Sequence, residues 1–340
     1  MPSDFIAEAV DKFGETILVD ENEVIEVIST GCLSLDVSIG VGGIPKGKVT
    51  QIYGSEGCGK TTIALGIARS CLDDGGKVLY LDAENLLDYA VIRDMVGESL
   101  DPERFIILKP VSAESAFTMA EMAFNTGEFD LVIIDSVAAL APEKEKEDED
   151  FSGSVTVGAL PRLISRFLRR NVTDSIKKNN VALLLLNQVR DKVGAYMATF
   201  DVPGGHALKH FCSVIISLSR GQEITVGKEK VGVQSKFVVK KNKLSAPFRS
   251  YTIPIIFGRG VDRYSDIVDF CTMLGIIKKA GAHYKFEGEP LGQGKLSAGN
   301  YIKEHKEVYD RIQEKVYASL NKYTSIDTDA LEQEVESEGE

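Results

Sequence analysis

Apolar runs alternate with helical patterns from Val49 to about Leu218. The apolar runs read VTQIY, VLYLD, FIIL, LVIID, VALLLL and SVIISL, and the helical patterns between them include residues 61–70, 113–124 and 163–176. Continuous apolar strands separated by helices are typical of a mostly parallel sheet that is covered on both faces. The pattern therefore predicts an α/β core built on such a sheet.

The pattern changes after Arg220. The segments SKFVVKK and SYTIPIIF mix polar and apolar residues and have no helix between them, which predicts an antiparallel extension of the same sheet. From Asp262 to about Leu320, helical patterns surround the glycine-rich, hairpin-like segment GAHYKFEGEPLGQG. That stretch predicts a small α/β domain.

The two ends of the chain differ from the middle. Residues 4–13 have the pattern of a short amphipathic helix. Its apolar side consists of Phe5, Ile6, Ala9, Val10 and Phe13. Residues 325–340 contain Asp and Glu, no Lys or Arg and few apolar residues, which is typical of a disordered acidic tail. We therefore expect four units, over residues 1–30, 31–260, 261–324 and 325–340.

Composition narrows the class of protein. Of the 340 residues, 44% are hydrophobic and 26% are charged, and no apolar run approaches the roughly 18 residues that a membrane span needs. The N-terminus is acidic where a secretory signal would be basic, so we expect a cytoplasmic protein without a membrane partner. The five cysteines form no CxxC pair, which favours reduced thiols over disulfides or a zinc site. The net charge of −12, taken alone, argues against a nucleic-acid partner.

A phosphate-binding motif follows the first apolar strand. It matches the pattern G-x-x-x-x-G-K-[ST] and consists of Gly54, Ser55, Glu56, Gly57, Cys58, Gly59, Lys60 and Thr61. Glycines let backbone N–H groups turn inward around phosphates, Lys60 offsets the charge of the β- and γ-phosphates, and the Thr61 hydroxyl can ligate magnesium. The strand before the motif and the helical pattern after it favour a P-loop that binds ATP over an ordinary glycine-rich turn.

Two acidic residues at strand ends complete the expected site. Asp135 ends the apolar run LVIID, where open α/β sheets place their ligand sites, and is predicted to act with Thr61 at the magnesium ion. Glu84 follows the run VLYLD, whose tip we expect beside the P-loop, and could orient or deprotonate an attacking water. The alternative, that Glu84 caps the next helix, stays open on spacing alone.

From Val27 to Tyr317 the chain resembles the RecA family of strand-exchange recombinases. The matching segments are ISTGCLSLD, GSEGCGKTT, LDAENLLD, LVIIDSVAAL, LNQVRDKVG, GGHALK, VVKKNKLSAPF and GAHYKFEGEPLGQGK. The resemblance implies an enzyme that uses ATP and Mg²⁺, assembles as a helical homo-oligomer on single-stranded DNA and pairs it with homologous double-stranded DNA. It leaves a bacterial or a bacteriophage origin open.

The resemblance also implies roles for single residues. Glu84 matches the catalytic glutamate, Gln188 matches the glutamine that senses the γ-phosphate, and both join Lys60 as catalytic residues. Thr62 extends the P-loop match, Asp88 resembles the position beside the adenine, and Tyr89 is the nearest candidate for a displaced adenine-stacking tyrosine. Lys241 and Lys243 match lysines that reach the ATP of the neighbouring subunit, so the active site would be completed by assembly.

The family contacts DNA through two mobile loops, which correspond to about residues 143–158 and 189–204. The helix after the first loop carries four arginines spaced to share one face, Arg162, Arg166, Arg169 and Arg170, a stripe suited to a phosphate backbone. A solvated helix face is the alternative reading. In the second loop, Arg190 and Lys192 are the expected DNA contacts, and an ordinary flexible loop is the alternative.

Several positions depart from the family pattern. The first loop is acidic from Glu143 to Asp150, so no DNA contact is carried over there, and His210 stands where the family usually has a phenylalanine that couples ATP state across the interface. Cys58 replaces a commoner serine, at a position that contributes mainly backbone. The N-terminal helix is short, so it would dock a neighbouring subunit less firmly.

The acidic tail and a basic small domain reconcile the net charge with DNA binding. Residues 331–340 resemble a family tail that moderates access to duplex DNA, with an inert extension as the alternative. The basic duplex-facing surface would comprise Lys278, Lys279, Lys285 and Lys295.

Two rival functions remain open. A filament scaffold that stimulates self-cleavage of a LexA-type repressor would act in the SOS response, and a single-strand-binding protein is a further partner in the family. A hexameric helicase or clock-type ATPase shares the core but lacks the C-terminal match.

Overall fold

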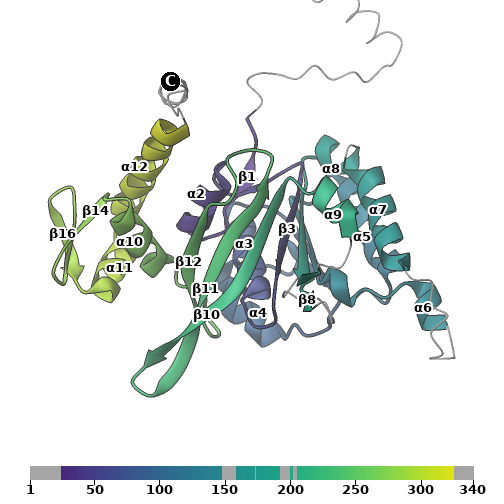
Figure 1. Cartoon of the computed structure of the whole chain (residues 1–340), viewed down its shortest axis with the longest axis horizontal. Helices are drawn as coiled ribbons and strands as arrows, with labels where there is room; N and C mark the ends of the chain where they lie inside the picture. The colour runs from purple at the N-terminus through teal and green to yellow at the C-terminus, as the bar shows by residue number, and fades with distance from the viewer. Residues whose placement is uncertain (1–23, 148–157, 173, 192–199, 202–204, 325–340) are drawn as a thin grey trace, which may run out of the picture.

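A computed structural model of the chain describes residues 24–147, 158–172, 174–191, 200–201 and 205–324. The described strands form a nine-stranded sheet with the order β13-β12-β11-β10-β3-β7-β6-β4-β5 (Figure 1). Six neighbouring strands are parallel to one another, which confirms the predicted α/β core. They are β10 (Val214–Val226), β3 (Val49–Gly54), β7 (Ala182–Gln188), β6 (Leu131–Asp135), β4 (Val78–Asp82) and β5 (Phe105–Leu108).

Helices cover both faces of this sheet, and each face has its own apolar core. On one face, α2 (Leu33–Ile39), α3 (Lys60–Asp73) and α4 (Tyr89–Val96) pack on alternate strand residues such as Ile52 and Ile133. On the other face, four helices pack on the intervening residues, such as Val132 and Ile134. These helices are α5 (Ala113–Thr126), α7 (Ala159–Asn171), α8 (Ser175–Lys178) and α9 (Gly205–Phe211). The continuous apolar strands are therefore explained by burial on both faces.

The antiparallel extension is also confirmed. β10 pairs with β11 (Glu229–Asn242), β11 with β12 (Ser250–Ile256) and β12 with β13 (Gly260–Val261), each in antiparallel register. In Figure 1 the β10–β11 hairpin projects from the lower edge of the sheet. A short pair, β1 (Val27–Ile28) with β2 (Ile44–Pro45), lies outside the large sheet.

The C-terminal part forms a smaller α/β unit on the β12 side of the core (Figure 1). Its antiparallel strands are β14 (Ile277–Ala280), β15 (His283–Phe286) and β16 (Glu289–Gln293), and the β15–β16 hairpin matches the predicted glycine-rich segment. Its helices are α10 (Arg263–Met273), α11 (Lys295–Glu304) and α12 (Lys306–Thr324).

Buried polar contacts join this unit to the core. Asp266 on α10 is fully buried, and it accepts hydrogen bonds from the Ser34 hydroxyl (2.6 Å) and the Ser34 backbone N–H (3.1 Å) on α2. Burial raises the pKa of Asp266, and these hydrogen bonds oppose that shift. The contact fixes α10 against α2 at one defined position, because a buried carboxyl without its donors would be costly.

Some expectations fall outside the described residues: the N-terminal helix at 4–13, most of the first loop and the acidic tail at 325–340. Of the first loop, the structure describes α6 (Glu143–Glu147). Every helix in the described ranges is too short or too polar to cross a bilayer.

Candidate functional site

The predicted site residues lie at the carboxyl ends of neighbouring parallel strands. In the β3–β7 register Gly54 is opposite Gln188, and in the β4–β6 register Asp82 is opposite Asp135. These strand ends share one edge of the sheet, where open α/β sheets bind their ligands.

The P-loop runs from the end of β3 into α3. Gly59 has a φ of 96°, a left-handed conformation that favours glycine, and α3 begins at the next residue. The Lys60 ammonium donates to the backbone carbonyls of Gly54 (3.1 Å) and Ser55 (2.8 Å), so it is held across the loop, and only 8% of Lys60 is exposed. Backbone N–H groups at the start of a helix, together with a lysine, form a site for phosphate.

The rest of the loop divides into exposed and buried positions. Ser55, Glu56 and Gly57 are exposed, and Thr61 and Thr62 are half-buried on the first turn of α3. Cys58 is buried, and burial raises the pKa of its thiol. The Cys58 carbonyl accepts a hydrogen bond of 2.7 Å from the Ser235 hydroxyl on β11. The buried, neutral thiol agrees with a position that contributes mainly backbone.

Asp135 lies directly beside the P-loop helix. Its Oδ2 accepts from the Thr61 hydroxyl at 2.8 Å and from the Tyr80 hydroxyl at 2.7 Å. Asp135 is 6% exposed, and burial raises its pKa, while the hydrogen bonds from Tyr80 and Thr61 lower it. The structure therefore brings together the two residues predicted for magnesium.

Protein groups alone do not form a metal cage here. Within the described ranges, no group of three or more His, Cys, Asp or Glu side chains is arranged to hold a metal ion. The oxygens of Thr61 and Asp135 suit magnesium, which keeps several waters and takes its remaining ligands from phosphates rather than from an all-protein site. The donor set therefore fits a magnesium ion that arrives with a nucleotide.

Glu84 and Gln188 meet at the same edge. The Gln188 side-chain amide donates from Nε2 to Glu84 Oε1 at 2.6 Å, and both residues are half-buried. The strand before Glu84, β4, is not a neighbour of the P-loop strand, because β6 and β7 lie between β4 and β3. Gln188 bridges this gap, since its strand β7 pairs with both β3 and β6.

Asp88, not Glu84, caps the next helix. Asp88 is the N-cap of α4, and its Oδ1 accepts from the Ala90 backbone N–H at 2.8 Å. The helix-capping alternative for Glu84 is therefore wrong. Tyr89 is the first residue of α4 and is 58% exposed, so both residues predicted near the adenine are accessible to a ligand.

Lys241 and Lys243 converge on the end of α9. Lys241 Nζ donates to the carbonyls of Lys209 and His210, and Lys243 Nζ donates to the His210 carbonyl at 3.2 Å. Partial burial and the neighbouring charge of Lys243 lower the pKa of Lys241. Two cations at the carbonyl end of a helix are favourably placed. His210 is exposed, and its ring meets Phe211 edge-on.

The predicted arginine stripe occupies one exposed face of α7, while residues such as Ile164 and Phe167 on the opposite face are buried. The four arginines line a single shallow depression together with Ser165. Arg170 Nε also forms an ion pair of 2.7 Å with Glu121 on α5. Arg190 begins β8 (Arg190–Asp191), which pairs with β9 (Phe200–Asp201), and Lys192 lies outside the described residues.

Two contributors to the site were not predicted from the sequence. Tyr80 donates to Asp135, and Ser235 holds the P-loop backbone at Cys58. Tyr80 carried a usable signal, because a fully buried tyrosine within an apolar strand needs a hydrogen-bond partner for its hydroxyl. The sequence gives no comparable signal for Ser235, since its contact depends on the pairing of β11 with the sheet.

Comparisons with known proteins assign both parts of the chain to one family. Residues 3–262 match the family model for the RecA N-terminal domain, and residues 265–321 match that for the RecA C-terminal domain. Protein RecA of Thermus aquaticus is 40% identical over 300 residues, which cover 88% of this chain and 86% of that protein. Protein RecA of Aquifex aeolicus (strain VF5) is 39% identical over 293 residues, 86% of this chain and 83% of that protein. Among solved structures, the RadB recombinase aligns with a TM-score of 0.52 and 27% identity, covering 69% of this chain and 98% of that one.

Proposed function

The chain belongs to the RecA family, and from that premise we propose that it is an ATP-dependent DNA recombinase. It forms filaments on single-stranded DNA, hydrolyses ATP and pairs the bound strand with homologous duplex DNA. The observation that carries the proposal is that Lys60, Asp135 and Glu84 lie at one edge of the sheet. The chain that holds them also matches the RecA N-terminal and C-terminal domains in order.

In this proposal the P-loop binds the ATP phosphates. The backbone N–H groups at the start of α3 surround them, and the Lys60 ammonium exchanges its two carbonyl contacts for phosphate oxygens. Thr61 and Asp135 would hold magnesium, which would neutralise charge on the phosphates. Tyr80 keeps Asp135 in place, because its hydroxyl donates to the oxygen that Thr61 also contacts.

Glu84 is the proposed general base. A carboxylate positioned within reach of the γ-phosphate can orient and deprotonate the attacking water. Gln188 positions Glu84 through the 2.6 Å hydrogen bond, and it is the last residue of β7, immediately before the second predicted DNA loop. Gln188 therefore connects Glu84 directly to the start of the second predicted DNA loop.

Assembly completes the site in the proposal. Lys241 and Lys243 reach the ATP of a neighbouring subunit, which requires them to leave the carbonyls at the end of α9. The helix α9 follows the second predicted DNA loop in the chain, so DNA binding at that loop would affect it. Filament formation and ATP would affect the same helix, because Lys241 and Lys243 would leave its carbonyls.

DNA contacts are assigned to the arginine stripe of α7, with Arg162, Arg169 and Arg170 as its proposed phosphate ligands, and to Arg190 and Lys192 in the second loop. Support comes from the exposed, aligned positions of the α7 arginines. The lysines of the small domain are the proposed surface for duplex DNA.

Joint-molecule formation tests the proposed function. The full chain, ATP and magnesium are mixed with circular single-stranded DNA and linear duplex DNA. We expect joint molecules with homologous duplex, and none with heterologous duplex or with the Lys60→Ala variant. Equal yields with homologous and heterologous duplex would contradict homologous pairing. No observation among the described residues favours the repressor-cleavage scaffold as a separate function.

A further inference from the structure

Asp82, the last residue of β4, has a carboxylate that is almost completely buried, since only 1% of the residue is exposed. Within the described ranges it forms no ion pair with a lysine, arginine or histidine. A buried carboxylate is costly unless hydrogen-bond donors satisfy it. The groups that donate to Asp82 therefore indicate its role.

Both donors are backbone N–H groups of the loop that carries Glu84. Asp82 Oδ1 accepts from Leu86 at 3.4 Å, and Oδ2 accepts from Leu87 at 3.2 Å. Hydrogen bonds to a charged acceptor are stronger than those between neutral groups. Glu84 lies between Asp82 and these amides in the chain, so the carboxylate closes the loop in which Glu84 sits.

The beginning of the same loop is held by β6. The Asp135 carbonyl accepts from the Ala83 N–H at 2.7 Å and from the Glu84 N–H at 3.3 Å. Asn85 follows with a φ of 55°, a left-handed conformation typical of tight turns. Gln188 then holds the Glu84 side chain through its amide. The backbone around Glu84 is therefore fixed on both sides of the turn.

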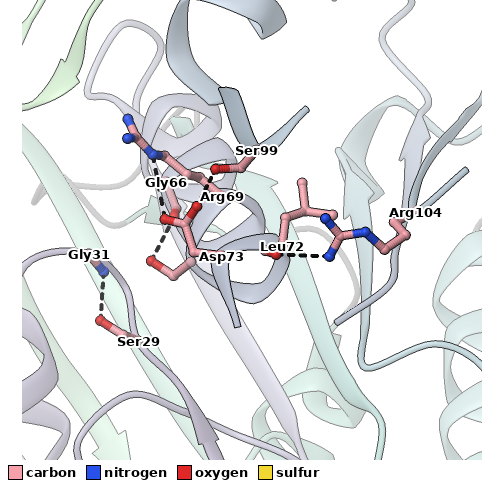
Figure 2. Close-up of polar contacts among 9 residues, drawn as sticks. Ser29, Gly31, Gly66, Arg69, Leu72, Asp73, Ser99 and Arg104 are labelled. Carbon is pink, nitrogen blue, oxygen red and sulfur yellow. Dashed lines mark hydrogen bonds and ion pairs between the residues drawn. The ribbon is translucent and has the colours of Figure 1, made fainter. Parts of the chain in front are cut away.

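The far end of the β4–β5 connection is fastened to a different element. The Ser99 hydroxyl donates to Asp73 on α3 (Figure 2). Arg104 Nη1 donates to the Leu72 carbonyl at 2.9 Å, on the same helix (Figure 2). These contacts come after α4 in the chain, whereas Glu84 comes before it. The loop that carries Glu84 therefore depends on contacts of its own.

We propose that Asp82 is a positioning residue for the general base, a role that rests on the proposed function of Glu84 in ATP hydrolysis. By holding the Leu86 and Leu87 amides, its carboxylate sets the path of the loop and hence the place of the Glu84 carboxylate. A displacement of about 1 Å in a reacting geometry can cost roughly 100-fold in rate. Asp82 acts through Glu84, since both of its own oxygens are occupied by the loop.

The start of α4 has a separate anchor. Leu87 is followed by Asp88, whose side chain caps α4 by accepting from the Ala90 N–H at 2.8 Å. The residues predicted near the adenine are therefore held without Asp82. A change at Asp82 should slow hydrolysis by moving Glu84, and it should leave ATP affinity nearly unchanged.

A double-mutant cycle tests the proposal on the full chain. Asp82→Asn keeps the shape of the side chain but offers one acceptor oxygen instead of two. We expect single-turnover ATP hydrolysis to be roughly 10- to 100-fold slower and ATP affinity to stay within about threefold. In the Glu84→Gln background the same substitution should cost less than about twofold, because no general base is left to position. Equal losses in both backgrounds would overturn the proposal.

Two control variants separate positioning from a general loss of stability. Asp130→Asn removes a carboxylate that accepts from the Lys77 N–H at 2.9 Å, just before the opposite end of β4. Ser99→Ala removes the contact with Asp73 at the far end of the same connection. Neither should slow single-turnover hydrolysis by more than about twofold. A slowing in either control as large as that in Asp82→Asn would mean that destabilisation explains the result.

Amide hydrogen exchange gives a second measurement, which requires no ATP hydrolysis. Leu86 is 77% exposed, so its amide should exchange quickly unless Asp82 accepts from it. In the chain without DNA we expect the Leu86 and Leu87 amides to be protected, and to exchange at least about tenfold faster in Asp82→Asn. Failure to form joint molecules would count against the proposed function and leave this measurement readable. Unprotected amides in the original chain, or equal protection in Asp82→Asn, would contradict the role of Asp82.

Discussion

Gln188, at the end of β7, donates a 2.6 Å hydrogen bond from its side-chain amide to Oε1 of Glu84, which follows β4, and β6 is the one strand between them. The contact gives the proposed base a fixed position. It also ties that base to the residue at which β7 ends and the second predicted DNA loop begins.

Replacing Glu84 with Gln should separate binding from hydrolysis. The variant should bind ATP and assemble on DNA, but hydrolyse ATP roughly 100- to 10,000-fold more slowly, because it lacks the general base. Single-turnover hydrolysis and nucleotide binding measure the two effects. Equal losses in both would mean that Glu84 supports the fold of the site instead.

Replacing Gln188 with Ala should mainly affect the response to DNA. Glu84 keeps its carboxylate but loses its positioning contact, so we expect stimulation of ATP turnover by single-stranded DNA to fall at least about tenfold, with ATP affinity nearly unchanged. Asn187→Ala is unsuitable as a control, because Asn187 is buried and its Oδ1 accepts from the Gln188 backbone. Lys228→Ala, at an exposed position of the β10–β11 hairpin, is the control. If single-stranded DNA stimulates ATP turnover normally in Gln188→Ala, the effect of DNA does not reach Glu84 through Gln188.

The arginine stripe predicts that DNA binding depends on salt, and that its arginines contribute to this dependence by different amounts. Arg169→Ala should weaken single-stranded DNA binding for every sequence and reduce the log–log salt slope by about 0.7. Arg170→Ala should reduce it less, because Glu121 already pairs with Arg170 at 2.7 Å. Binding titrations at several salt concentrations give both slopes, with Lys228→Ala as the control. An unchanged slope for Arg169→Ala would favour the solvated helix face.

Asp36 predicts a pH dependence of stability. Asp36 is 4% exposed, and burial raises its pKa to about 7, against hydrogen bonds from Ser29 and Thr30. The folded state therefore holds this proton more tightly than the unfolded chain does. The stabilisation is present at low pH and is lost as pH rises from about 4 to about 7, by roughly 4 kcal/mol at most.

Asp36→Asn removes that titration. Its unfolding free energy, measured by denaturant at pH 5 and pH 8, should fall less with rising pH than that of the original chain. Glu229→Gln, at an exposed position of the hairpin, should keep the original dependence. The same fall in both chains would assign the pH dependence to other groups.

The sequence predicted what depends on local chemistry. The P-loop motif, the strand-end position of Asp135 and the shared face of the α7 arginines all follow from spacing along one element or one turn. Thr61 meets Asp135 as expected, because the carboxyl ends of parallel strands gather at one edge of the sheet.

Strand order was not predictable in the same way. The position of β4, which has two strands between it and β3, depends on crossover connections that leave no periodic signal. The Tyr80–Asp135 and Ser235–Cys58 contacts join residues 55 and 177 positions apart, so only the assembled sheet reveals which partner each hydroxyl meets.

ATP turnover by the full chain with and without single-stranded DNA tests the central claim most directly, namely that this ATP site serves DNA recombination. The account predicts slow turnover alone, strong stimulation by single-stranded DNA, and no turnover in Lys60→Ala under either condition. Equal turnover with and without DNA, or near-normal turnover in Lys60→Ala, would contradict it.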